Sequence, residues 1–236
     1  MHPQLHTWDE HDGLASTVTA TLSGGFSGYA LTHSDVGGYN GGTLWLAQLL
    51  FGVRVVRTPE LLHRWVELCA FSGAVFRTHE GLVPDFNHQV WSDDFSTMHF
   101  KKFALVFVAF RPYRRALMAE AHAKGWPLIR HPVLHFPNDP VLLADREEAK
   151  RGDGYGRLRE FMLGADWLIV PVMEPGAQVC PLLAALSPAP HLRILSRPPL
   201  PGLLAHSEVR LDRHRPAECA RLPARRRVGA HVALRW

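Results

Sequence analysis

Four side chains that can move protons or bind a ligand lie just after two short apolar segments of the sequence. His33 and Asp35 follow the first segment, and His79 and Glu80 follow the second. Imidazole nitrogens and carboxylate oxygens can hold zinc or manganese, but this spacing matches no metal-binding motif. The same groups suit polyol recognition, because carboxylates accept hydrogen bonds from sugar hydroxyls and imidazoles donate them. A structural interpretation stays open, in which Asp35 accepts loop amides and His79 is satisfied inside the core.

Two further residues complete this group. Tyr39 follows a pair of glycines, and its aromatic face can pack on the CH groups of a sugar ring. Arg77 lies at the end of the second apolar segment, where its guanidinium could orient Asp35 or Glu80 by bidentate pairing or form a buried structural ion pair. The predicted substrate-binding set is His79, Arg77, Asp35 and Tyr39. We expect no metal and no cofactor.

Helix signals place the elements that must carry these residues. Apolar residues at fourfold spacing predict a helix over residues 10–24, which a glycine pair ends. Thr58 as the cap and Pro59 in the first turn predict the start of a second helix. Residues 94–124 are predicted to form a long helix with a break at Pro112. Its predicted core stripe consists of Phe100, Phe103, Val106 and Phe107.

Residues 28–33 and 73–77 are predicted strands, and polar residues follow the C-terminal end of each. Alternation of helices with such strands favours a βα barrel or a doubly wound sheet, in which the strand C-termini carry the chemistry. Two strands are too few to close a barrel, so we expect part of a larger domain. Residues 128–136 and 167–172 are predicted to be strands of a different, antiparallel element.

The charge of the chain is concentrated near its end. The formal net charge is +4, yet residues 177–236 hold ten arginines, no lysine and three acids, and residues 1–176 carry more acids than bases. The same segment contains eight prolines and neither Phe nor Tyr. It could be a basic arm for an anionic partner, a poorly ordered tail, or a GC-rich gene read in a shifted frame. We favour the shifted frame and expect low order.

Several function classes find no support in the sequence. The apolar runs are too short for a membrane span, and the first residues lack the apolar core of a signal peptide. Cys69, Cys180 and Cys219 form no CxxC pair. No glycine-rich phosphate loop lies between a strand and a helix, and no GxSxG motif is present. We expect a cytoplasmic protein that binds neither membrane nor nucleic acid.

Six segments of the sequence resemble glycoside hydrolase family 31, which contains α-glucosidases, α-xylosidases and sulfoquinovosidases. In chain order they are LSGGFSGYALTHSDVGGY (22–39), ELLHRWVELCAFSGAVFRTHEG (60–81), NHQVWSD (87–93), RPYRR (111–115), HPVLHFPNDP (131–140) and FMLGADWLIVPVMEPG (161–176). The resemblance implies a (β/α)8 barrel and a retaining mechanism with two carboxylates, one a nucleophile and the other an acid/base. Residues 22–39 then correspond to the region around the seventh barrel strand.

The resemblance also implies roles for individual residues. His79 matches the histidine that holds sugar hydroxyls, Arg77 its neighbour in the Arg-x-His motif, and Asp35 the loop aspartate that organises the site. Tyr39 matches the tyrosine that helps recognise the sulfonate in sulfoquinovosidases. The acid/base position falls at Pro3 and the nucleophile would precede Met1, so we expect this chain to lack both catalytic carboxylates. About ten extra residues separate Tyr39 from the second helix.

The sequence therefore predicts three parts. Residues 1–125 are the C-terminal part of a (β/α)8 barrel, residues 126–176 the first strands of a β-sandwich, and residues 177–236 the Arg/Pro-rich tail. The predicted function is hydrolysis of α-glucosides or sulfoquinovosides in the intact enzyme, with the missing N-terminal part as a partner. The alternative is a non-catalytic remnant or a carbohydrate-binding fragment. Whether the chain alone is an enzyme stays open.

Overall fold

The computed structural model describes residues 5–39, 55–81, 84–140, 142–144, 160–177, 193–195 and 231–233. The chain divides into two compact units. The first comprises Met1–Leu128 with Met173–Ala177, and the second Ile129–Val172 with Gln178–Trp236. Each unit is described by itself below. Among the described helices, none has the length and apolar character that crossing a membrane requires.

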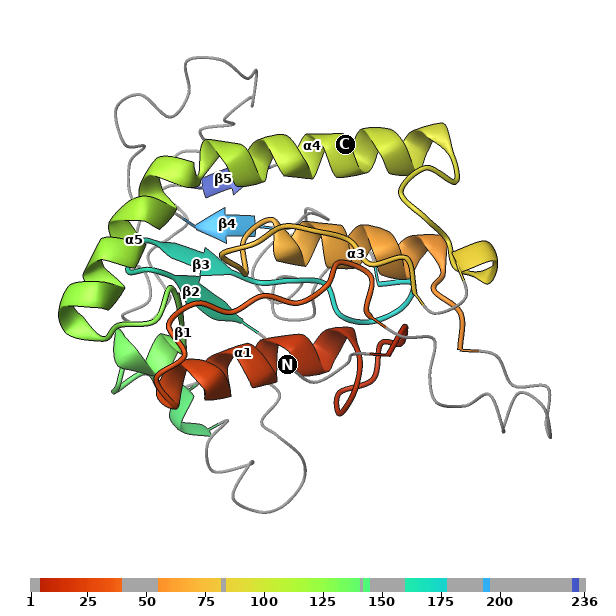
Figure 1. Ribbon diagram of the computed structural model, residues 1–236. Helices are drawn as coiled ribbons and strands as arrows, with labels where there is room; N and C mark the ends of the chain where they lie inside the picture. The colour runs from red at the N-terminus through yellow and green to blue at the C-terminus, as the bar shows by residue number, and fades with distance from the viewer. Residues whose placement is uncertain are drawn as a thin grey trace. The chain divides into compact units, whose positions relative to one another are not determined.

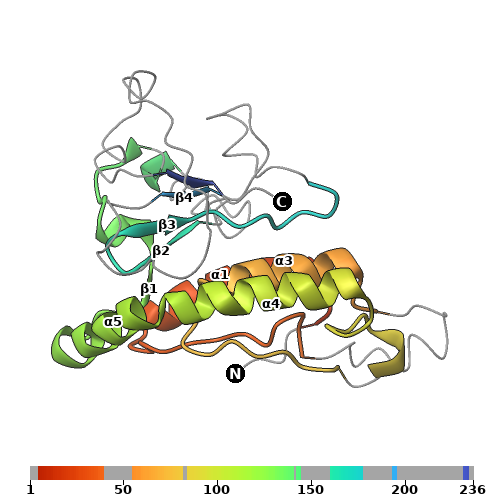
Figure 2. The same cartoon turned by 90° about the horizontal axis from the view of Figure 1, so that it is seen from above.

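The described residues of the first unit form four α-helices, which Figure 1 labels. They are α1 (Leu14–Phe26), α3 (Pro59–Cys69), α4 (Asp94–Ala109) and α5 (Arg111–Lys124), with a short 3-10 helix η1 (Pro84–Phe86) before α4. Figure 2 shows α1, α3 and α4 as one layer, with the extended segments that follow α1 and α3 beneath them. The predicted helix over residues 10–24 is thus confirmed as α1, with its boundaries shifted by two to four residues.

Three helix ends form where the sequence predicts them, but the glycine pair Gly24 and Gly25 lies inside α1, so the prediction that it ends this helix is wrong. Thr58 caps α3, because its Oγ1 accepts a hydrogen bond from the Leu61 amide at 3.3 Å, and Pro59 opens the helix. The long helix predicted over residues 94–124 does break, with α4 ending at Ala109 and Pro112 standing in the first turn of α5. Gly125 ends α5 in a left-handed conformation with φ of 74°.

The two extended segments that precede the candidate site residues run parallel. Val36 and Thr78 form a parallel bridge, in which the Val36 amide donates to the Arg77 carbonyl at 2.9 Å. The Ala74 amide donates to the Thr32 carbonyl at 3.1 Å. The parallel pairing agrees with consecutive βα units. The predicted strands themselves are wrong in extent, because only these widely spaced amides pair across and no continuous ladder forms at residues 28–33 and 73–77.

Packing against the second extended segment fixes α4. The ring of Phe76 stacks on Phe100 and Phe107, with centroids 5.0 and 5.4 Å apart. Of the predicted core stripe only Phe103 is fully buried, at 1% exposure. Phe100, Val106 and Phe107 are partly exposed, because they lie toward the edge of the contact between α4 and its neighbours. The stripe therefore packs as predicted but is less deeply buried.

The second unit holds a five-stranded antiparallel sheet in the order β1-β2-β3-β4-β5. The strands are β1 (Ile129–Arg130), β2 (Phe161–Leu163), β3 (Trp167–Ile169), β4 (Arg193–Leu195) and β5 (His231–Ala233). The predicted antiparallel element is confirmed. The strand predicted over residues 128–136 stops early, because Pro132 has no amide hydrogen and begins the 3-10 helix η2 (Pro132–Leu134).

Strands β4 and β5 lie within the segment 177–236, for which the sequence predicts low order. The rest of that segment after Ala177, with Cys180 and Cys219, lies outside the described residues. The low order expected for residues 177–236 therefore stays a prediction.

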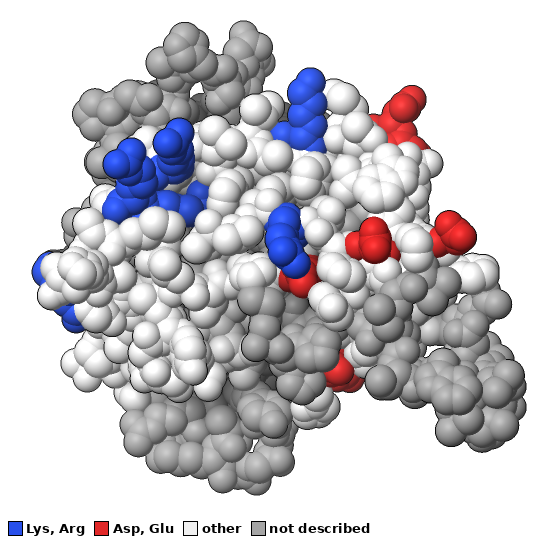
Figure 3. Space-filling model, viewed as in Figure 1, with Lys and Arg blue, Asp and Glu red and all other residues white. Residues whose placement is uncertain are grey.

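Charged side chains at the start of α4 and at the end of α5 complement the helix dipoles. Asp93 and Asp94 stand at the start of α4, and His122 and Lys124 at the end of α5. In Figure 3 blue side chains gather over α5 and the adjoining end of α4, whereas red ones lie toward the side where α4 begins. The Ser96 amide holds the pKa of the Asp93 carboxyl below its usual range. Basic and acidic side chains thus lie toward different sides of this face.

Candidate functional site

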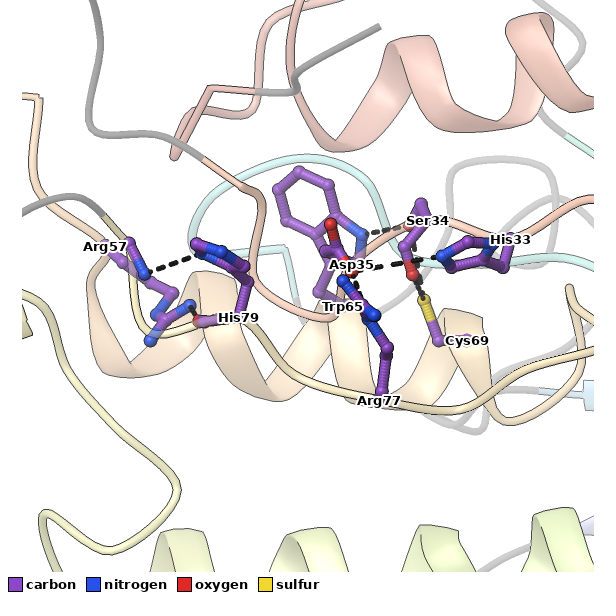
Figure 4. A network of polar contacts seen from close by, with 9 residues as sticks. His33, Ser34, Asp35, Arg57, Trp65, Cys69, Arg77 and His79 are labelled. Atoms are coloured by element: carbon purple, nitrogen blue, oxygen red, sulfur yellow. Dashed lines mark hydrogen bonds and ion pairs between the residues drawn. The ribbon is translucent and has the colours of Figure 1, made fainter. Parts of the chain in front are cut away.

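Asp35 and Arg77 form an ion pair at the ends of the two extended segments. Arg77 Nε donates to Asp35 Oδ1 at 2.9 Å, and the Asp35 side chain is only 5% exposed while that of Arg77 is 57% exposed. His33 Nε2 lies 3.9 Å from the same carboxylate oxygen. Figure 4 shows these three side chains turned toward one another. The pair confirms Asp35 rather than Glu80 as the partner of Arg77, but through a single nitrogen, so the bidentate geometry is wrong.

The neighbouring residue ties this strand end to helix α3. Trp65 Nε1 donates to Ser34 Oγ at 2.8 Å, and Cys69 Sγ lies 3.4 Å from the same oxygen. Trp65 is fully buried and Cys69 is 2% exposed. Burial raises the pKa of the Cys69 thiol to about 12, so this cysteine packs and does not act as a nucleophile. The contacts of Ser34 with Trp65 and Cys69 therefore fix the backbone just before Asp35 against α3.

Tyr39 and His79 form the second pair of the site. Their ring centroids are 4.2 Å apart with an interplanar angle of 34°. The chain reaches Tyr39 through Gly37 and Gly38, whose φ angles of 88° and 85° place them in a region that favours glycine. The Gly81 amide donates to His79 Nδ1 at 3.0 Å. The neutral imidazole therefore carries its proton on Nε2, where it can donate to a ligand.

Arg57 is a site residue that sequence reasoning missed. It lies two residues before α3, is 1% exposed, and its Nη1 donates to the His79 carbonyl at 2.6 Å. Its Nε donates to the His88 carbonyl at 2.7 Å and its Nη2 to Gln89 Oε1 at 2.7 Å. Burial lowers the pKa of this guanidinium to about 10. The sequence around Arg57 has no periodic apolar pattern that would predict burial of an arginine just before a helix cap. No sequence signal therefore separates Arg57 from an exposed arginine.

Three polar side chains around Arg57 were also missed as site residues. Asn87 Oδ1 accepts from the Arg57 amide and pairs with His6 Nδ1, each at 2.9 Å. Gln89 Nε2 donates to the Glu80 carbonyl at 2.8 Å. Burial lowers the pKa of His6 to about 4, which keeps the imidazole neutral. Asn87 and Gln89 lie in the segment NHQVWSD, so the family resemblance had already singled out their region.

The remaining candidates do not join the site. The Glu80 side chain is exposed and is not the partner of Arg77. Among the described residues, His, Cys, Asp and Glu side chains form no group of three that could hold a metal ion. The acid/base position assigned to Pro3 lies outside the described residues, and so do residues 40–54, which make up most of the stretch between Tyr39 and Leu61 where about ten extra residues are expected.

His88 takes part in a separate polar cluster between α3 and α4. His88 Nε2 lies 2.7 Å from Ser96 Oγ and 3.2 Å from Asp93 Oδ2, and His63 Nε2 lies 2.8 Å from the same hydroxyl. In a catalytic triad the serine and the acid use different ring nitrogens, whereas here both face Nε2 of His88. Ser96 is also 1% exposed. The cluster joins two helices and is not a nucleophilic site.

Parallel extended segments, each followed by polar side chains and a helix, are arranged as in a βα barrel or a doubly wound sheet, in which the site lies at that end. Comparison with known proteins supports a barrel domain. Residues 5–114 match the glycosyl hydrolases family 31 TIM-barrel domain. The chain therefore carries part of a TIM-barrel domain of glycosyl hydrolase family 31.

Individual relatives agree with the family. A sulfoquinovosidase of Agrobacterium fabrum is 37% identical over 169 residues, which make up 72% of this chain and 22% of that protein. A probable alpha-glucosidase of Oryza sativa is 27% identical over 171 residues, 72% of this chain and 16% of that protein. A solved structure of a family 31 sulfoquinovosidase from E. rectale, bound to an aza-sugar inhibitor, has a TM-score of 0.59 and 33% identity over 75% of this chain and 23% of that chain. The chain thus spans less than a quarter of the length of each relative.

Proposed function

We propose that this chain carries the sugar-binding rim of an enzyme that hydrolyses α-glycosides. The observation that carries the proposal is the Tyr39–His79 pair beside the Asp35–Arg77 ion pair, at the ends of two parallel segments joined by the Val36–Thr78 bridge. Family membership of the chain supports the reaction class.

The geometry gives each residue of the rim a task. His79 presents Nε2–H toward a sugar hydroxyl, since Nδ1 is occupied by the Gly81 amide. The Tyr39 ring, 39% exposed, offers an apolar face to the sugar CH groups and a hydroxyl at its edge. Asp35 is buried and engaged by Arg77, so it orients that guanidinium and is not free to attack an anomeric carbon. The retaining reaction in the intact enzyme would need two carboxylates about 5–5.5 Å apart.

We further propose a sulfoquinovoside as the substrate in preference to an α-glucoside. The relatives at 37% and 33% identity are named sulfoquinovosidases, whereas the probable alpha-glucosidase is 27% identical. A sulfonate carries a full negative charge and needs hydrogen-bond donors. The Tyr39 hydroxyl and the exposed part of the Arg77 guanidinium supply donors of that kind on the same rim.

The proposal includes the domain arrangement expected from the sequence. Residues 1–125 form the C-terminal part of the barrel, and the antiparallel strands that follow are the start of a β-sandwich. The order β1-β2-β3 with antiparallel pairing supports this assignment, because sandwiches are built from antiparallel sheets.

A ligand titration of the 236-residue chain tests the proposal. Methyl α-sulfoquinovoside and methyl α-D-glucopyranoside are added separately, and the His79 and Tyr39 signals are followed by NMR. We expect shifts at both residues, with tighter binding of the sulfonated sugar, and at least tenfold weaker binding after His79→Gln. The control is His122→Gln, which changes an exposed histidine of α5 in the same way.

Two results would count against the proposal. If neither sugar shifts the His79 and Tyr39 signals, the proposal that these residues bind sugar is refuted. If both sugars bind with equal affinity, the proposed preference for a sulfonated sugar is refuted. Cleavage of 4-nitrophenyl α-D-glucopyranoside by the same chain is measured in parallel. It separates a hydrolase from a chain that binds sugar without turnover.

A further inference from the structure

One buried side chain, that of Arg57, is hydrogen-bonded to two loops around the proposed sugar site and lies in close contact with a third. Arg57 donates from Nη1 to the His79 carbonyl at 2.6 Å, from Nε to the His88 carbonyl at 2.7 Å, and from Nη2 to Gln89 Oε1 at 2.7 Å. Its own amide donates to Asn87 Oδ1 at 2.9 Å. These four described partners are all neutral. Hydrogen bonds to neutral partners offset little of the free-energy cost of removing a cation from water. The contribution of Arg57 is therefore sought in the groups that it positions.

The first loop touches Arg57 directly. A Cβ added to Gly37 would lie 2.6 Å from Arg57 Cδ and 2.7 Å from Nη1. The backbone that leads to Tyr39 therefore rests on the guanidinium with no space for a side chain. Since Tyr39 packs on His79, Arg57 supports both members of this pair, one through Gly37 and the other through a carbonyl.

The loop after His79 is fixed by the same network. Gln89, which accepts from Arg57, also donates to the Glu80 carbonyl at 2.8 Å. A Cβ on Gly81 would lie 2.5 Å from His6 Cε1 and 2.6 Å from Asn87 Nδ2. Gly81 is the residue whose amide occupies His79 Nδ1. The peptide group between Glu80 and Gly81 is thus held by Gln89, which accepts from the Arg57 guanidinium, and Gly81 is enclosed by His6 and Asn87. The guanidinium therefore acts on this amide, and with it on the tautomer of His79, through Gln89.

We propose that Arg57 is a positioning residue that holds the His79 imidazole as its Nε2–H tautomer against Tyr39. The role of this tautomer, to present one hydrogen-bond donor to a sugar hydroxyl, rests on the proposed function. The planar guanidinium serves three acceptors that lie in different directions. A lysine would keep the charge but not the fixed fork of donors.

The test is made on the full chain labelled with 15N-histidine. His79→Gln identifies the His79 signal among the 15 histidines. Wild type is expected to show protonated Nε2 and bare Nδ1 for His79 at neutral pH. In Arg57→Met and Arg57→Lys, we expect this signature to give way to exchange between tautomers, with at least tenfold weaker binding of methyl α-sulfoquinovoside. A folded Arg57→Met chain that keeps the wild-type signature would overturn the proposal.

Arg114→Met is the matched control. Arg114 is also buried and donates to the Gly73 and Phe107 carbonyls at 3.1 and 2.7 Å, but it contacts none of the three loops. We expect it to lower stability and leave the His79 signature unchanged. If Arg57→Met does not fold, Gln89→Leu takes its place, and an unaltered tautomer there also overturns the proposal. The 15N readout needs no ligand, so a chain that fails to bind sugar but shows the tautomer change refutes the proposed function and not the positioning role.

Discussion

Replacing Gly37 by alanine tests how closely the Tyr39 loop rests on Arg57. Gly37 has φ of 88°, and Gly28 has φ of 90°, but an added Cβ at Gly28 meets nothing within 4 Å. Gly28→Ala therefore measures the backbone strain alone, about 1–2 kcal/mol. At Gly37 the same methyl group would displace Arg57 and break at least one hydrogen bond from a charged group, worth about 1.5–3 kcal/mol. We expect Gly37→Ala to lower the free energy of unfolding by about 2.5–5 kcal/mol.

Urea unfolding of the full chain measures the two costs. Tryptophan fluorescence follows unfolding, and Trp65, which is fully buried on α3, is one of the seven tryptophans that contribute to it. The difference between the two variants is the quantity of interest, because the strain at positive φ cancels in it. If Gly37→Ala costs no more than Gly28→Ala, the close approach to Arg57 is not present in solution, and the support of the loop by this side chain is refuted.

Three other predictions concern stability and reactivity. Thr58→Ala should lower the free energy of unfolding by about 1 kcal/mol through loss of the α3 cap, and Thr58→Ser should restore most of it in the same urea titration. Burial lowers the pKa of His6 and His99 to about 4, so the unfolded chain takes up protons first as the pH falls. Stability should be full above about pH 6.5 and decline toward pH 4, and His99→Phe should weaken that decline in unfolding experiments at pH 7.5 and 4.5. In a chain whose other two cysteines are replaced by serine, Cys69 should resist iodoacetamide at pH 8 until urea unfolds the protein, and labelling of the native chain would contradict its burial.

Local signals predicted the parts of the fold that depend on neighbouring residues. Thr58 and Pro59 start α3 because a hydroxyl cap and a proline act within one turn. Pro112 divides the long helix for an equally local reason. The strand predicted past residue 131 failed because Pro132 outweighed the apolar pattern around it.

The site was predicted as a set of residue types and not as a geometry. The sequence placed Asp35, Arg77, Tyr39 and His79 after two adjacent segments, and the structure pairs them as Asp35 with Arg77 and Tyr39 with His79. Arg57 escaped prediction because its burial arises from three loops that approach it from residues 37, 79 and 88. Such contacts are fixed by tertiary packing, and no local period or spacing encodes them.

Saturation-transfer NMR on the full chain with methyl α-sulfoquinovoside tests most directly whether the Tyr39–His79 pair meets a sugar. The account predicts transfer from the protein to the ring CH protons of the sugar, lost in Tyr39→Ala and strongly reduced in His79→Gln, with His122→Gln unchanged. Transfer of equal strength in all three variants would contradict it, because the sugar would then bind elsewhere on the chain.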